Sequence, residues 1–300
     1  MKTLIVNFHY IRNKKYKYDG IHPITKNAFI KIIKKFKNKN YNFISPNELG
    51  NSNSFLKKKN VMFTFDDGLK DHLNILKILE KFKIKGLFFI CTKPFKNEPL
   101  DVHTVHFLRS ITHPNKMFNY LVNKFPNKFK LLIKNKNKIS KFYIYDDERN
   151  AIIKYFFNFI INKKLLNEIG KEILKKNKIS KKNFLKKTYM NKIDLNNLIK
   201  KGHFIGLHGH SHEPLNKLNS KVYNDLSKNQ KILSKLTGIK NFKFFAYPYG
   251  RNHALPKNLY RFKVKHSLDF CFTMNKGVNI KNFEYHNIKR INPNEVDKYL

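Results

Sequence analysis

Val61-Met62-Phe63-Thr64-Phe65-Asp66-Asp67-Gly68 is the stretch of sequence that decides the fold. Its apolar run predicts a buried strand, and that strand ends abruptly at two neighbouring carboxylates. The glycine then permits a sharp turn out of the strand. Adjacent residues on a strand face opposite ways, so Asp66 and Asp67 can take different tasks, one binding a metal and the other accepting a proton. An Asp-Asp helix cap followed by a glycine turn is the alternative interpretation.

Strands and helices alternate on both sides of this stretch. The hydrophobic patterns predict strands at 4–8, 42–44, 61–65, 87–91, 204–207, 242–247 and 270–273, and helices at 25–38, 70–83, 194–201 and 222–236. Such alternation is typical of βαβ units in a mostly parallel sheet. From about residue 95 to 188 the chain is lysine-rich and helical in pattern, which predicts a helical insertion with a solvated loop at 134–138.

The composition limits the class of protein. The chain has 300 residues, of which 41% are hydrophobic, and 62 Lys and Arg against 20 Asp and Glu give a net charge of +42. That hydrophobic fraction is too high for a disordered basic tail, and two cysteines cannot form a disulfide framework. The sequence shows neither an apolar run that could span a bilayer nor a secretory signal, so we expect a cytoplasmic protein.

The positive charge has two interpretations. It would attract an anionic partner such as nucleic acid or an acidic membrane surface. Compositional drift toward lysine would also produce it, and drift is favoured because the basic residues are dispersed and arginine, the preferred reader of phosphates and base edges, is scarce. We therefore expect no specific nucleic-acid partner and at most weak association with an anionic membrane surface. The oligomeric state stays open.

A second polar cluster follows a predicted strand, at His208-Gly209-His210-Ser211-His212. Both an extended strand and a helical turn bring His208 and His212 to one side, and neutral imidazoles at this spacing suit first-row metal ions. With Asp67 they would form a site of two histidines and one carboxylate. A metal ion held there would lower the pKa of a water molecule and polarise a carbonyl oxygen. We expect His210 to be a loop residue rather than a ligand.

The two motifs resemble the signature motifs of the polysaccharide deacetylase family. Members of this family are carbohydrate esterases of the NodB-homology type. Phe245-Ala246-Tyr247-Pro248-Tyr249-Gly250 and the segment 202–207 are also similar to family motifs, and 287–291 resembles the closing segment of the bacterial surface-glycan branch. The resemblance implies an α/β fold, a distorted (β/α) barrel, with residues 1–300 forming a single catalytic domain that contains the helical insertion.

The resemblance also implies roles for individual residues. One divalent metal ion is expected, with zinc favoured over cobalt, manganese, iron and nickel, and its ligands would be Asp67, His208 and His212. Asp66 would be the general base that takes a proton from the water attacking an amide carbonyl. The backbone N–H of Tyr249 would help to hold the tetrahedral oxyanion. A general acid must protonate the departing amine, and His286 is the candidate, with an ordinary surface histidine as the alternative.

The chain departs from the family's pattern in two places. Ala246 stands where chitin deacetylase-like members have an arginine that orients the base, and the chain has no tryptophan. Arg290 would orient Asp66, hold a substrate anion or form a plain ion pair. His9, at the end of the first predicted strand, resembles a histidine of the surface-glycan branch and would line the pocket, or would simply be hydrogen-bonded at a strand terminus.

The leading hypothesis is a metal-dependent hydrolase that removes an N-acetyl group from an amino sugar of a surface-glycan or lipopolysaccharide precursor. Its partner would be an N-acylated sugar or glycan precursor met in the cytoplasm. A deformylase or cyclic-amide hydrolase would use the same site on another substrate. A non-catalytic basic protein that binds glycan or nucleic acid is the third hypothesis, and binding without turnover would distinguish it.

Overall fold

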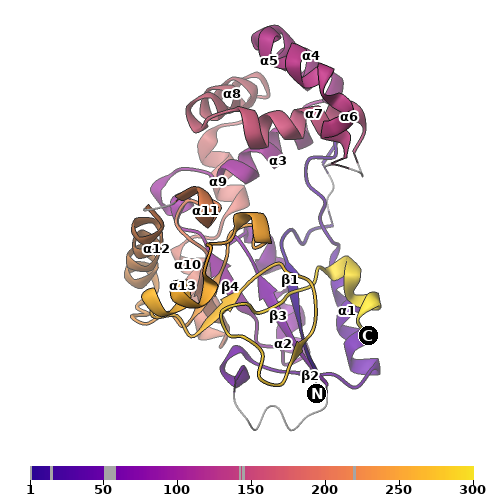
Figure 1. Ribbon diagram of the computed structural model, residues 1–300. Coiled ribbons are helices and arrows are strands. Elements are labelled where there is room, and N and C mark those ends of the chain that lie inside the picture. Colours follow the sequence, from indigo (N-terminus) through magenta and orange to yellow (C-terminus); the bar gives the residue numbers. More distant parts are fainter. Residues whose placement is uncertain (1, 14–15, 51–58, 142, 144–145, 219–220) are drawn as a thin grey trace. The chain divides into compact units, whose positions relative to one another are not determined.

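The computed structural model describes residues 2–13, 16–50, 59–141, 143, 146–218 and 221–300 (Figure 1). The chain forms two compact units. The first comprises Met1–Asn13, Pro23–Glu98 and Leu185–Leu300, and the second comprises Lys14–His22 and Pro99–Phe184. The single catalytic domain with an insertion at about residues 95–188 stays a prediction.

The first unit is built on a mostly parallel sheet, as the alternating pattern predicted. The strands lie in the order β7 (Phe270–Phe272), β6 (Phe244–Ala246), β5 (Phe204–Leu207), β4 (Leu87–Ile90), β3 (Lys59–Phe65), β1 (Lys2–Phe8) and β8 (Asn279–Ile280), and β2 (Asn42–Phe43) pairs with β3. Within this sheet only the pair β1–β8 is antiparallel among the described strands. Phe8 lies opposite Phe65, so β1 and β3 end at the same level.

The segment 288–291 joins the two ends of this sheet. Ile288 pairs in parallel with Phe272 of β7, and Ile291 pairs in parallel with Val6 of β1. Backbone hydrogen bonds accompany both bridges. The sheet therefore curls into a distorted barrel, and the segment that closes it comes from near the end of the chain.

Helices follow most of the strands in the first unit. They are α1 (Lys26–Asn38), α2 (Leu76–Lys81), α10 (Lys192–Lys200), α11 (Leu215–Leu218), α12 (Val222–Thr237) and α13 (Leu259–Lys265), with short 3-10 helices η1 (Pro46–Glu48), η3 (Lys70–Ile75), η4 (Lys93–Lys96), η7 (Asn252–Ala254) and η8 (Pro293–Lys298). The helix predicted at 70–83 is divided into η3 and α2. Polar side chains of η3 hydrogen-bond to the backbone of His9 and Ile11, so this segment is tied to the loop after β1.

Helix α1 shows how the sequence pattern becomes core. The side chain of Thr25 caps it by accepting a hydrogen bond from the amide of Ala28 at 3.1 Å. The apolar residues spaced at three and four along α1 are buried, as predicted: Phe29, Ile32, Ile33 and Phe36. The ring of Phe63 in β3 contacts the rings of Phe29 and Phe36, so the helix covers the strand with aromatic contacts.

The second unit is helical and has its own apolar core. Its elements are α3 (Asp101–Ile111), α4 (Pro114–Lys124), α5 (Pro126–Lys134), α6 (Lys136–Ser140), α7 (Glu148–Tyr155), the π-helical turn η5 (Phe156–Ile160), α8 (Lys163–Lys176) and the first half of α9 (Lys181–Thr188). The prediction of a solvated loop at 134–138 is wrong. Leu132 and Ile139 are both buried in this core, and only a turn at Asn135 separates α5 from α6. Among the described helices, none is long and apolar enough to cross a membrane.

We expect Phe63→Ala to lower the free energy of unfolding by about 3–5 kcal/mol, because it removes a fully buried aromatic ring from the barrel core. Denaturant titration followed by circular dichroism measures this change. Ile193→Ala is the control, since that side chain in α10 is 78% exposed and its loss should cost less than about 0.5 kcal/mol. Equal effects of the two substitutions would contradict the described core.

Candidate metal centre and active site

The two carboxylates that end β3 are both buried. Asp66 and Asp67 are 2% and 3% exposed. The amide of Asp66 donates to the carbonyl of Phe8 at 3.0 Å, which continues the pairing of β3 with β1. Asp67 then adopts a left-handed backbone, with φ of 74°. This conformation is uncommon outside glycine, and it turns the chain sharply at the strand end.

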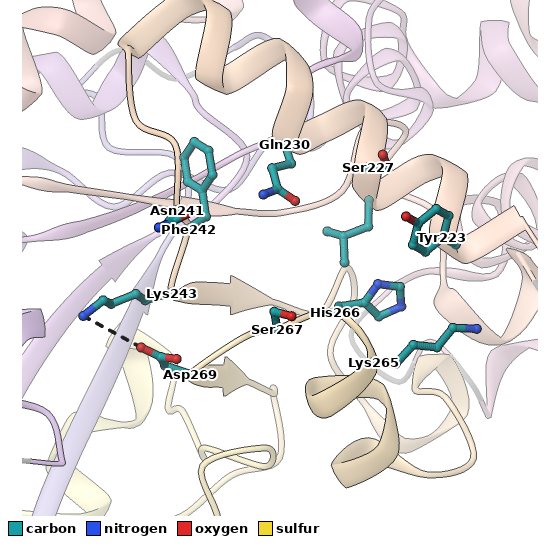
Figure 2. A pocket seen from close by; sticks show the side chains of 11 residues that line it. Tyr223, Ser227, Gln230, Asn241, Phe242, Lys243, Lys265, His266, Ser267 and Asp269 are labelled. Carbon is teal, nitrogen blue, oxygen red and sulfur yellow. Dashed lines mark ion pairs between the residues drawn. The ribbon is translucent and has the colours of Figure 1, made fainter.

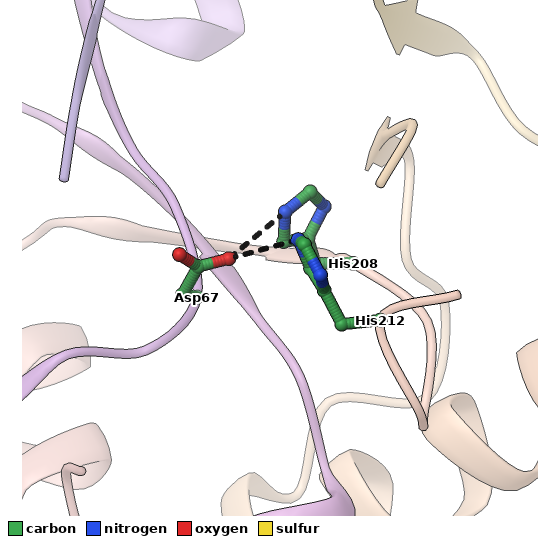
Figure 3. Close-up of side chains that lie close together, drawn as sticks. All are labelled: Asp67, His208 and His212. Atoms are coloured by element: carbon green, nitrogen blue, oxygen red, sulfur yellow. Dashed lines mark ion pairs between the residues drawn. The ribbon is translucent and has the colours of Figure 1, made fainter. Parts of the chain in front are cut away.

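Two histidines that follow β5 point at one oxygen of Asp67 (Figure 3). The Nε2 atoms of His208 and His212 each lie 3.2 Å from Asp67 Oδ1. One ligand atom from each residue lies within 4.8 Å of the others, and all three residues are buried. The structure thus brings together the carboxylate and the two imidazoles that the sequence predicted as metal ligands.

The hydrogen bonds of His208 suit a metal ligand. Its Nδ1 lies 2.7 Å from the carbonyl oxygen of Ala246, which accepts only, so Nδ1 carries the proton and donates it. The lone pair of Nε2 is then directed toward Asp67, the arrangement that outer hydrogen bonds give to metal-binding histidines. Two imidazole nitrogens and one carboxylate oxygen are a donor set that zinc and other first-row ions accept. The residues present therefore fit such an ion.

Burial and nearby charges have opposite effects on the pKa of His208. Burial alone would lower its pKa, but the charges of Asp66 and Asp67 outweigh burial and hold the pKa above its ordinary value. In the metal-free protein a proton on His208 is therefore stabilised by the same carboxylates that would face a metal ion. Protons and a metal ion compete for this imidazole.

Arg290, in the closing segment, forms a bidentate ion pair with Asp66. Its two terminal nitrogens donate to Oδ1 and Oδ2 at 2.8 and 2.9 Å, and its Nε donates to the carbonyl of Thr273 at 2.9 Å. The arginine is fully buried. Burial would raise the pKa of Asp66, but Arg290 and the neighbouring His208 hold it below its ordinary value. This geometry is that of the predicted ion pair, and the same two bonds are those that orienting Asp66 would need; the role of Arg290 stays a prediction.

His9 follows β1 and lies beside the same carboxylates. Its Nε2 is 3.9 Å from Asp67 Oδ2, and 42% of its side chain is exposed. Its backbone carbonyl is fixed by His72, whose Nε2 lies 2.8 Å away. Burial lowers the pKa of His72 to about 4, so a neutral His72 donates this hydrogen bond. His9 is thus a partly exposed imidazole on a firmly held loop.

Tyr249 and His286 were predicted as catalytic residues from the resemblance. Tyr249 lies near the histidines, with its ring 5.0 Å from that of His212, and its backbone is left-handed with φ of 61°. His286 instead contacts Glu284 at 3.5 Å and the ring of Tyr260 at 5.7 Å. Among the described residues, no contact joins His286 to the buried carboxylates. The role of the Tyr249 amide stays a prediction, and the role of His286 as general acid is untested, since neither of these two side-chain contacts supports it.

Two residues that the sequence analysis did not single out, Asp225 and Asn229 of α12, hold the histidine loop through its backbone amides. Asn229 is fully buried between Leu226 and Leu233 on the apolar face of α12. A polar residue at such a core position was the signal that could have found it, because buried amides occur where their hydrogen bonds are satisfied.

A polar pocket of about 550 Å³ lies elsewhere in the same unit (Figure 2). Residues of α12 and α13 line it together with the segments that precede β6 and β7, and Lys243 and Asp269 face each other across 3.9 Å there. The predicted site residues follow strands instead of preceding them. Since the strands are parallel, this pocket belongs to the opposite edge of the sheet.

A family model described as polysaccharide deacetylase matches residues 54–111 and 168–263. The two ranges hold 58 and 96 residues, which is 154 of 300 and more than half of the chain. They contain both the Asp-Asp motif and the histidine motif. The match confirms the resemblance that those motifs indicated.

Solved structures share the fold along the whole chain. The deacetylase PplD of Streptococcus pyogenes, in complex with acetate, is 15% identical with a TM-score of 0.59, covering 99% of this chain and 97% of that chain. IcaB from Ammonifex degensii is 13% identical with a TM-score of 0.60, covering 99% and 94%. A de-N-acetylase from Aggregatibacter actinomycetemcomitans is 12% identical with a TM-score of 0.58, covering 100% of both. This likeness confirms the predicted fold class. A comparison with curated proteins finds no significant match.

We expect Arg290→Met to lower the free energy of unfolding by about 3–5 kcal/mol at pH 7, because it leaves the Asp66 carboxylate buried and unpaired. In the parent, the pKa of Asp66 is lower in the folded than in the unfolded protein. The ionised carboxylate therefore stabilises the fold at pH values above the unfolded pKa, and this stabilisation is lost as the pH falls through the folded pKa. Without Arg290 the pKa of Asp66 should rise, because only the neighbouring histidines then oppose the effect of burial, so the variant gains less stability than the parent as the pH rises. The difference between the two proteins should therefore narrow on acidification.

Denaturant titration between pH 3 and 8 measures this difference. Lys35→Met is the matched control, because Lys35 forms an exposed ion pair with Asp297 and its loss should cost less than about 1 kcal/mol at any pH. A loss for Arg290→Met that is equally small, or that grows on acidification, would show that the buried pair does not hold Asp66 ionised.

Proposed function

The chain belongs to the polysaccharide deacetylase family, and on that premise we propose that it is a metal-dependent hydrolase that removes an N-acetyl group from an amino sugar. The observation that carries the proposal is the convergence of His208 and His212 on one oxygen of Asp67, directly beside a carboxylate that Arg290 holds. This arrangement supplies both a metal-binding donor set and a proton acceptor at one strand end. A plain helix cap would need neither the histidines nor the arginine.

Three residues would hold the ion: Asp67, His208 and His212. We propose zinc, since two imidazoles and a carboxylate with open positions are a common donor set of catalytic zinc. An ion bound there lowers the pKa of a water molecule toward neutrality and polarises the carbonyl oxygen of the substrate.

Asp66 is the general base in this proposal. Its lowered pKa keeps the carboxylate ionised at neutral pH, so it accepts a proton from the water that attacks the amide carbonyl. Arg290 holds both carboxylate oxygens and fixes their direction. The backbone N–H of Tyr249 donates to the oxyanion that forms, and such a donor contributes about 3–4 kcal/mol in other hydrolases.

The departing amine must receive a proton, and we propose that His9 donates it. His9 has a partly exposed imidazole beside Asp67, and its backbone is fixed by His72. His286, the candidate from the sequence, has Glu284 and Tyr260 as its side-chain contacts. Of the two histidines, His9 is the one that lies beside the carboxylate proposed to hold the ion.

The proposed substrate class is a surface-glycan or lipopolysaccharide precursor that carries an N-acetylated amino sugar. One of the similar structures is a de-N-acetylase, which supports an N-acetyl group as the target. The cytoplasmic location and the weak association with anionic membrane surfaces stay predictions from the sequence.

We expect the purified protein to release acetate from N-acetylated glucosamine oligomers, to lose this activity on chelation, and to regain it with zinc, cobalt or manganese. His208→Ala should not retain one metal ion per protein molecule, and its activity should fall more than about a hundredfold. Mutating a residue that only hydrogen-bonds to a metal ligand already lowers affinity or activity by about 10–100-fold. His266→Ala is the control, because His266 lies at the opposite edge of the sheet.

Acetate release is measured by a coupled enzyme assay, and metal content by mass spectrometry. Full activity of metal-free protein would contradict the proposal. Release of formate from N-formyl sugars in place of acetate would favour the deformylase hypothesis. Salt-sensitive glycan binding without any turnover would favour the non-catalytic binding protein.

The proposed acid is tested by His9→Gln and His286→Gln, each assayed on the same substrate. We expect His9→Gln to lower kcat by about 10²–10⁴-fold, the usual contribution of a general acid. His286→Gln should stay within about threefold of the parent in the same assay. The reverse result would return the role to His286.

A further inference from the structure

We infer that Asp225 and Asn229 of α12 are positioning residues that hold the histidine loop in its metal-binding shape and so set the affinity for the ion. This inference rests on the proposed metal site. The two residues are four apart on one helix, so they share a face. That face contacts residues 208–211, the loop that begins at the ligand His208 and leads to the ligand His212.

Asn229 connects the start of the loop to the end of β4. Its Oδ1 accepts a hydrogen bond from the backbone amide of His208 at 3.1 Å. Its Nδ2 donates to the carbonyl of Ile90 at 3.0 Å and to the hydroxyl of Thr92 at 3.1 Å. The side chain is fully buried, so the amide of His208 would lose this partner without gaining water if Asn229 were removed, whereas the hydroxyl of Thr92 would keep Nδ1 of His210, 2.9 Å away.

Asp225 holds the middle of the same loop. Its two carboxylate oxygens accept the amides of His210 at 2.8 Å and Ser211 at 3.0 Å. The chain passes so close to this carboxylate that a Cβ on Gly209 would lie 2.9 Å from Oδ2, and Gly209 also has φ of +75°. The loop is therefore shaped around the carboxylate, with glycine where a side chain would collide.

The opposite side of the loop is held by residues that follow β4. The amide of Lys93 donates to the carbonyl of His210 at 2.9 Å, and the thiol of Cys91 donates to the carbonyl of His208 at 3.1 Å. Hydrogen bonds on both sides leave little freedom to the three residues between the ligands, 209–211. They also oppose relaxation of His212, whose backbone is left-handed with φ of 58°.

These contacts fix the backbone on which both histidine ligands are carried. A loop that is already in its bound shape loses little conformational entropy when a ligand arrives. We call Asp225 and Asn229 the clamp residues; without one of them the loop should sample other shapes, and ordering it would then offset part of the free energy of metal binding. Metal affinity should then fall even though no ligand has been changed.

The test compares three variants with the parent: Asp225→Ala, Asn229→Leu and Leu233→Ala. Leu233 is the matched control, because it is fully buried on the same helix but belongs to the apolar core. The dissociation constants for zinc and cobalt are measured by competition with a chromogenic chelator. Hydrogen exchange of the backbone amides of 208–212 in metal-free protein and the thermal midpoint are measured in parallel.

We expect Asp225→Ala and Asn229→Leu to weaken metal binding by about 10–100-fold and to speed exchange at 208–212. Leu233→Ala should lower the thermal midpoint while keeping the parent's dissociation constants. Clamp variants that bind metal within twofold of the parent would overturn this inference, as would a control that loses as much affinity as they do. Since Asp225 is only half-buried, its variant gives a result even where Asn229→Leu fails to fold.

A parent protein that binds no ion would overturn the metal site itself and this inference with it. Parent binding combined with unchanged clamp variants would overturn this inference alone. The two failures are therefore distinguishable in one experiment.

Discussion

The buried ion pair between Arg290 and Asp66 joins the closure of the barrel to its chemistry. Two charges taken out of water are costly, and only complete hydrogen bonding offsets that cost. The pair meets this condition, because both oxygens of Asp66 are held and Arg290 also bonds to the carbonyl of Thr273. Arg290 lies on the segment 288–291, which bridges β7 and β1. The segment that closes the barrel is thus also the segment that carries the partner of the proposed base.

The other site residues depend on the direction of the strands. In a parallel sheet the carboxyl ends of neighbouring strands meet at one edge, where side chains distant in sequence converge. His9 follows β1, Asp67 follows β3, and His212 lies on the loop after β5. Asp67, His212 and Tyr249 all have left-handed backbones. Such strain is retained where the surrounding structure over-determines it, and here it lies at the site.

Local patterns predicted much of this structure. Apolar runs located the strands, and the Asp-Asp and histidine motifs at their ends predicted Asp67 and the two histidines that converge on it. Long-range contacts were less accessible. Arg290 and Asp66 are 224 residues apart, and no periodicity links them, so the sequence left three roles open for Arg290. The stretch at 134–138 was misassigned because it contains several lysines, while the buried apolar residues near it, Leu132 and Ile139, are seven positions apart. The clamp on α12 was missed because Asn229 is a single polar residue in an apolar face.

The most direct test is the crystal structure of the purified, metal-loaded protein, with diffraction data collected on both sides of the metal's absorption edge. We expect one anomalous peak bounded by Nε2 of His208, Nε2 of His212 and Oδ1 of Asp67, with Arg290 still paired to Asp66. An ion coordinated by other residues, or three side chains that turn away from one another in the presence of excess metal, would contradict the proposed metal centre.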